Sequence, residues 1–216
     1  MHARSTLPLF PVFVLSFLVF VAPIARLHAQ QRLSPQDAAA TIHRMPADRE
    51  DYIRWQTECD ATKCTLSADV LRGASGDPPD RTDHDQYITL SINLPRKSAK
   101  PDAVLLHLPP WAQKDQGLFL AFVPKPAADP SIPPELDADG ATSLAFTTCD
   151  DESCLAQAPG GLIAANGRNI DVFDRLLHSD HLIVLFTSDG APYRTSIALD
   201  SFHQAWERYQ KEQLNQ

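Results

Sequence analysis

Two stretches of the sequence share one plan: "WQTECDATKCTLSADV" (Trp55–Val70) and "LAFTTCDDESCLAQAP" (Leu144–Pro159). In each stretch, a segment with apolar residues leads to a cysteine, four polar or small residues follow, and a second cysteine begins another segment with apolar residues. The tetrads "DATK" and "DDES" are turn-like and lie between strand-like runs, which places each cysteine pair across a β-hairpin. Opposed Cβ atoms about 4.5 to 5.5 Å apart reach disulfide geometry with little adjustment. We therefore predict two stapled turns, one closed by Cys59–Cys64 and the other by Cys149–Cys154.

Other uses of these cysteines stay open at this point. Four cysteines allow three disulfide connectivities. A four-thiolate zinc site built from both pairs is an alternative, although four-residue gaps lie at the edge of the usual ligand spacing. A redox-active pair is less favoured, because C-x4-C is not the C-x-x-C arrangement that lowers a thiol pKa. We expect structural disulfides that fix strand register.

The first residues have the pattern of a secretory signal: a lightly basic start followed by an apolar run that is densest at Val12–Ala22. That run is shorter than the roughly 20 residues a membrane-spanning helix needs, so an uncleaved anchor is the weaker interpretation. The predicted cleavage follows Ala29. We expect a periplasmic protein, with secretion or surface association as further options, and no stable membrane insertion after cleavage. An exported chain meets an oxidising compartment, where paired cysteines form disulfides.

Removing residues 1–29 leaves 17 basic against 27 acidic residues, a net charge near −10. Such a surface repels phosphate backbones, so we expect no nucleic-acid partner. Eighteen prolines against eight glycines indicate short elements separated by stiff loops. The remaining chain suits one domain with a real core. We expect an N-terminal helix and linker over 30–50 and a single domain over 51–216.

Strand-like segments dominate the chain from Tyr52 onward. In "QYITLSINL", polar and apolar residues alternate with the period of two that marks a half-buried strand. "TSDGAPY" supplies an Asp-Gly turn between the last two strands. The predicted fold is mainly β, an antiparallel β-sandwich of about 7–9 short strands with three helices. The other predicted strands are "YIRWQTE", "CTLSADVL", "AVLLHL", "LFLAFV", "SLAFTT", "CLAQA", "LIVLFTS" and "YRTSIAL".

Three helices are predicted beside these strands. The first begins in "SPQDAAATIHRM", with Ser34 as the N-cap and Pro35 in the first helical position. The internal segment "RNIDVFDRLLHSD" has helical spacing. "DSFHQAWERYQKEQ" closes the chain as a helix capped by Asp200 or Ser201. The aromatic residues of that last helix share one face, a pattern typical of core packing.

Two long loops, Gly73–Asp85 and Pro124–Gly140, are rich in proline, aspartate and glycine. Neither can continue a sheet ladder, so both are candidates for a binding edge, although solvated loops are the commoner outcome. Together with the two stapled turns they form the contact surface that the sequence favours.

The spaced landmarks resemble the invasion-associated locus B family of exported bacterial proteins. The resemblance rests on Trp55 before the first C-x4-C turn, on "INLP", on "LPPWAQKDQGLFLAF", on "FTTCDDESCLA", on "LIVLFTSDG" and on "IALDSFHQAW". It covers about Tyr52 to Trp206. The family usually has a glycine where this chain has Ser201, and Pro124–Pro134 resembles an insertion, which puts a shared partner surface in doubt. The resemblance implies a periplasmic or surface-exposed β-rich domain, linked in pathogens with entry into host cells, and it implies no catalytic residues.

Residues suited to chemistry are few and scattered. His178 and His181 in "HSDH" could approach one metal ion with Asp174 or Asp180, but a basic residue at a helix C-terminus is favoured without metal. His107 lies in an apolar run and is interpreted as a core or edge histidine. The cluster Asp80, Asp83, His84 and Asp85 lacks the ordered alternation and the closing glutamate of a calcium-binding loop, and so does "DADG" over 137–140. Ser75 lies outside the G-x-S-x-G pattern that builds the nucleophile turn of a serine hydrolase.

These observations favour a non-enzymatic binding protein of the bacterial envelope, without a cofactor, whose partner is an envelope or host-surface protein. The first alternative is a carrier that holds a small molecule between the sheets. The second is a metal-dependent hydrolase that uses His178 and His181. The sequence leaves the oligomeric state open.

Overall fold

The computed structural model describes residues 33–44, 52–71, 87–125, 141–165 and 167–214. The predicted signal segment 1–29 lies outside the described residues. So do the loop Gly73–Asp85, with Ser75 and the carboxylate cluster, and residues 126–140 of the Pro-rich loop.

Twelve strands and three α-helices form the described part of the chain. The strands are β1 (Tyr52–Cys59), β2 (Lys63–Leu71), β3 (Tyr87–Pro95), β4 (Ala103–Leu108), β5 (Leu118–Pro124), β6 (Ala141–Leu144), β7 (Phe146–Cys149), β8 (Cys154–Pro159), β9 (Leu162–Ala165), β10 (Arg168–Asp171), β11 (Ser179–Ser188) and β12 (Ala191–Ala198). The helices are α1 (Pro35–Arg44), α2 (Val172–His178) and α3 (Asp200–Tyr209), and a π-helical turn, η2 (Gln210–Leu214), continues α3.

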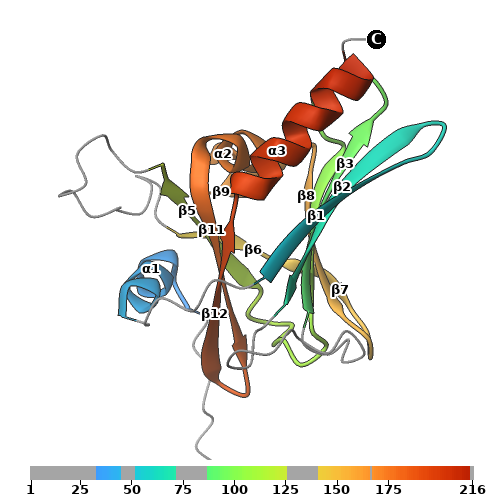
Figure 1. Cartoon of the computed structure of the whole chain (residues 1–216). Helices are drawn as coiled ribbons and strands as arrows, with labels where there is room; N and C mark the ends of the chain where they lie inside the picture. Colours follow the sequence, from blue (N-terminus) through green and yellow to red (C-terminus); the bar gives the residue numbers. More distant parts are fainter. Residues whose placement is uncertain (1–32, 45–51, 72–86, 126–140, 166, 215–216) are drawn as a thin grey trace, which may run out of the picture. The chain divides into compact units, whose positions relative to one another are not determined.

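The strands form three sheets in which every pairing is antiparallel. The six-stranded sheet has the order β1-β2-β3-β4-β8-β7, and the four-stranded sheet has the order β12-β11-β5-β6 (Figure 1). A separate hairpin pairs β9 with β10. The predicted mainly-β, antiparallel, sandwich-like fold is confirmed.

The main core follows from the alternation of apolar side chains along the strands. In β3, Ile88, Leu90, Ile92 and Leu94 are buried, as the period of two predicts. Leucines of the four-stranded sheet, among them Leu118 and Leu120, belong to the same core cluster. The space between the two sheets is thus filled by packed side chains.

A second, smaller core lies on the other face of the four-stranded sheet. There Ala38 and Ile42 of α1 pack against Phe119, Ala121 and Ile183. Ser34 starts α1 as predicted, because its Oγ accepts a hydrogen bond from the Asp37 N–H at 3.1 Å. The N-terminal helix is therefore docked on the sheet and covers its outer face.

The C-terminal helix α3 closes the main core. Phe202, Trp206 and Tyr209 are buried, and Phe202 contacts Trp55 of β1 with 4.8 Å between ring centroids. The Tyr209 hydroxyl donates to the Ser98 carbonyl at 2.9 Å, which ties the end of α3 to the β3–β4 turn. The predicted packing role of this aromatic face is confirmed.

Several local predictions were wrong. The internal helix spans only Val172–His178, because Arg168–Asp171 forms strand β10 instead. Asp171 caps this helix by accepting the Asp174 N–H at 2.9 Å. The N-cap of α3 is Leu199, without a side-chain hydrogen bond, and not Asp200 or Ser201.

The segment predicted as one strand, "SLAFTT", belongs to two sheets. β6 pairs with β5 in the four-stranded sheet, and β7, which begins two residues after β6 ends, pairs with β8 in the six-stranded sheet. Strands that switch sheets form the corners of packed sandwiches.

In the described residues no helix has the length and apolarity needed to cross a membrane.

Candidate functional site

The two stapled turns have the same internal structure. Disulfides join Cys59 to Cys64 and Cys149 to Cys154, the connectivity that the sequence predicts. In the first turn, Asp60 Oδ1 accepts the N–H groups of Thr62 at 2.7 Å and Lys63 at 2.9 Å. The two disulfides indicate an oxidising, non-cytoplasmic compartment.

The second turn repeats this arrangement. Asp150 Oδ1 accepts the N–H groups of Glu152 at 2.9 Å and Ser153 at 2.8 Å. The backbone hydrogen bonds from Thr62 and Lys63 lower the pKa of Asp60 from 3.8 to about 2, and those from Ser153 and Glu152 lower the pKa of Asp150. Sequence reasoning missed this role, although an aspartate directly after the first cysteine of both turns was its signal.

The stapled turns lie at opposite corners of the six-stranded sheet. Cys64 is opposite Leu94 at one end of the sheet, whereas Cys154 is opposite Leu108 at the other. The register between β3 and β4 puts about 20 Å along the strands and about 14 Å across them between Cys64 and Cys154, or about 24 Å in all.

This separation decides one alternative that the sequence leaves open. A zinc ion bound by both pairs is ruled out, because all four sulfurs would have to lie about 2.3 Å from one ion. The contact surface predicted from both turns and the two long loops stays a prediction, because the loops Gly73–Asp85 and 126–140 lie outside the described residues. Each turn belongs to a different end and edge of the sheet.

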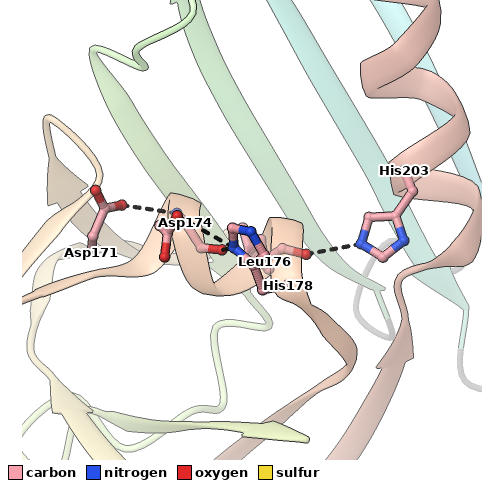
Figure 2. Close-up of polar contacts among 5 residues, drawn as sticks. All are labelled: Asp171, Asp174, Leu176, His178 and His203. Carbon is pink, nitrogen blue, oxygen red and sulfur yellow. Dashed lines mark hydrogen bonds and ion pairs between the residues drawn. The ribbon is translucent and has the colours of Figure 1, made fainter. Parts of the chain in front are cut away.

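The histidine cluster at the end of α2 is satisfied by local contacts, as Figure 2 shows for His178. His178 Nδ1 lies 2.8 Å from the Asp174 carbonyl oxygen and 3.3 Å from its carboxylate. His181, in β11, has its Nδ1 2.8 Å from the Asp180 carboxylate. His178 and His181 therefore each contact a different aspartate.

Three ligands for one metal are not assembled by the histidines and aspartates of the described residues. His203 of α3 places its Nε2 3.1 Å from the Leu176 carbonyl oxygen, which links α3 to α2 (Figure 2). His107 lies half-buried in β4 opposite Thr89 and Leu155, on the face of the sheet away from the core. The described geometry thus explains these histidines by packing and helix-end contacts.

A groove opens where the β6–β7 segment passes from the four-stranded to the six-stranded sheet. Its volume is about 830 Å³, and it lies between β6 and the β9–β10 hairpin, with β8 behind. Some Cα atoms of β6 lie within 8 Å of Cα atoms of β8 and β9. The lining residues are Pro35, Ala141, Thr142, Ser143, Leu144, Ala145, Gln157, Pro159, Leu162, Ile163, Ala164, Ala165, Arg168 and Ile170. We call this hollow the β6–β9 groove.

The edge of β6 that faces this groove is unpaired among the described strands. One edge of β6 pairs with β5, one face packs under α1, and the opposite face belongs to the main core. Strands β8 and β9 therefore lie beside the second edge of β6, the edge that does not pair with β5. The same holds for β9, which pairs only with β10 in the described residues.

The direction of the β6 amides follows from the turn between β11 and β12. Only Asp189 and Gly190 separate the pair Ser188↔Ala191, so this pair is hydrogen-bonded. Hydrogen-bonded and non-hydrogen-bonded pairs alternate along each antiparallel ladder, and each residue points its N–H and C=O towards one neighbouring strand only. When this alternation is followed from β12 through β11 and β5 to β6, Leu118↔Leu144 is a hydrogen-bonded pair as well. The N–H and C=O groups of the intervening residue Ser143 consequently point away from β5, into the groove.

A second observation agrees with this direction. A Cβ placed on Gly117, just before β5, would lie 2.7 Å from the Leu144 carbonyl oxygen, so this oxygen points towards β5. On the opposite wall, the Gly161 carbonyl accepts the Val172 N–H at 2.8 Å. By the same alternation, the backbone groups of Leu162 and Ala164 face away from β10.

The groove therefore offers main-chain donors and acceptors, one large exposed apolar side chain and one cationic side chain. Leu162 is 42% exposed at its lip, and Arg168 is the charged residue of the lining. A hollow of this volume falls within the range of ligand sites. Sequence reasoning missed the groove, because it depends on a strand that changes sheets and on a hairpin that was predicted as helix.

Comparison of the chain with protein-family models, with curated proteins and with solved structures finds no match. The case for function therefore rests on the geometry of the chain itself.

Proposed function

We propose that this chain is an exported, non-enzymatic binding protein of the bacterial envelope, and that its binding site is the β6–β9 groove. The observation that carries the proposal is the hollow of about 830 Å³ bordered by a strand edge with outward-facing backbone groups. An unpaired strand edge presents a row of N–H and C=O groups and is a template for pairing with another chain.

The compartment follows from the cysteines. All four cysteines form disulfides, which persist in oxidising compartments. The periplasm, with secretion or surface association as further options, is the compartment that a cleaved signal over residues 1–29 would give. The resemblance to invasion-associated locus B proteins supports the same setting, and a host-surface partner belongs to this proposal only through that resemblance.

The small-molecule carrier is the second candidate, because the groove has the volume of a small-ligand site. The ligand of such a carrier would occupy the groove and not the space between the sheets, which leucine side chains fill. A metal-dependent hydrolase has less support, since His178 and His181 each contact a different aspartate.

Photocrosslinking in living cells tests the proposal. A benzoylphenylalanine replaces Leu162 at the lip of the groove, and a matched control replaces Trp111, the other exposed large apolar residue of the described chain. We expect ultraviolet light to attach an envelope component at residue 162 and not at residue 111, with the product identified by mass spectrometry. Equal crosslinking at both positions, or none at residue 162, would contradict the groove as the binding site.

A further inference from the structure

The two edges of the four-stranded sheet are not equally protected. In the four-stranded sheet, β12 and β6 are the edge strands. Pro192 occupies a position of β12 from which an N–H would point away from β11, and proline has no N–H to offer. The β12 edge is thus blunted in the way that natural sheets avoid pairing with other chains.

Among the described residues, the β6 edge carries no such protection at its centre. Ser143, at the corresponding outward position, presents both an N–H and a C=O towards the groove. Its side chain is exposed and small, so it leaves the backbone accessible. Small side chains also line the rest of the groove, among them Ala141 and Ala145 beside Ser143 and Ala164 on the facing strand. An approaching backbone can therefore come within hydrogen-bonding distance of β6.

We propose that the β6–β9 groove binds an extended peptide segment, which adds to the edge of β6 that is unpaired among the described strands and forms a fifth strand of the four-stranded sheet. This inference rests on the proposed function and names the class of ligand. Strand addition gains affinity from main-chain hydrogen bonds and specificity from alternate side chains. β6 has four residues, a length of about 13 Å that matches a bound segment of four to six residues.

The apolar character of the groove defines the peptide further. Side chains of the bound peptide would alternate between the two faces of the added strand. Leu162 is exposed on the opposite wall of the groove and offers apolar contact to the side chains on one of these faces.

The test begins with the chain purified from the periplasm and used to select octapeptides from a random display library. Binding of the selected, fluorescently labelled octapeptides is then measured by anisotropy for wild type, Ser143→Pro and Ser143→Ala. Ser143→Pro removes the outward N–H without breaking the ladder to β5, whereas Ser143→Ala changes only the side chain. We expect about a tenfold loss of affinity for the proline variant and less than a twofold change for the alanine variant.

A second measurement does not depend on how the proline variant folds. Each residue of a selected octapeptide is N-methylated in turn, which removes one peptide N–H at a time. Because neighbouring residues of an added strand point in opposite directions, we expect loss of binding at every second position across the bound segment. Uniform tolerance of N-methylation would overturn the inference.

Three other outcomes would also overturn it. The first is equal binding by Ser143→Pro and wild type, with both variants melting as the wild type does. The second is the selection of no octapeptide, which would leave the proposed function intact if residue 162 still crosslinks to a small molecule. The third is a wild-type dimer that Ser143→Pro dissolves, since the β6 edge would then bind a second copy of this chain.

Discussion

Opening one disulfide at a time tests whether the two stapled turns act independently. The variant Cys59→Ala, Cys64→Ala frees a loop made of the two cysteines and the four residues between them. In the chain-entropy description, closing such a loop removes about 7 cal/mol/K from the unfolded chain, or about 2 kcal/mol at 25 °C. The variant Cys149→Ala, Cys154→Ala frees a loop of the same length, so it should lose the same amount.

The two variants are also matched in packing. Cys64 and Cys154 are both fully buried, whereas their partners are more exposed, so each variant removes a comparable amount of buried sulfur. Urea unfolding should show a loss of about 2 kcal/mol for each double variant, and Tm should fall by about 4 to 8 °C. Because about 24 Å separates the turns, the fourfold variant should lose the sum within about 0.5 kcal/mol.

Two results would refute this reasoning. A loss below about 0.5 kcal/mol in either double variant would mean that the turn held by Asp60 or Asp150 fixes its hairpin without the disulfide. A fourfold variant far less stable than the sum would mean that the two corners of the sheet are coupled, contrary to their placement.

Three further predictions concern the described residues. The depressed pKa of Asp60, about 2 against 3.8, means that its stabilisation is fully present above pH 3.8 and is lost as the pH falls towards 2. The difference in Tm between wild type and Asp60→Asn should therefore shrink from pH 5 to pH 2, and a constant difference would contradict the role of the carboxylate. Tyr209→Phe removes the hydrogen bond to Ser98 and should cost about 1 kcal/mol in urea unfolding; an unchanged midpoint would show that this bond contributes nothing. Phe202→Ala should cost about 3 to 5 kcal/mol, because the ring is fully buried against Trp55, and a loss below 1 kcal/mol would contradict the placement of α3 over the core.

Much of the fold could be predicted because its signals are local. The alternation in β3, the Asp189–Gly190 turn and the spacing of each cysteine pair are all contained in a few consecutive residues. The helix start at Ser34 is equally local. Features of this kind are set by side-chain period and turn chemistry before any tertiary contact forms.

The features that define the candidate site are not local. "RNID" and "VFDRLLH" continue one helical pattern, yet the first part is strand β10, because it pairs with β9 next to a glycine turn. The split between β6 and β7 depends on which sheet each half meets. Tertiary pairing overrides propensity in such places, and the groove exists only where these two long-range choices meet.

Hydrogen exchange at the Ser143 amide tests the central claim most directly. The ¹⁵N-labelled chain is followed by NMR with and without a saturating octapeptide selected on the wild type. The account predicts that the Ser143 N–H, which points away from β5, exchanges at least about tenfold more slowly with peptide, while the amides of Thr142 and Leu144, already bonded to β5, change little. An unchanged exchange rate at Ser143 under saturation would contradict strand addition at the β6 edge.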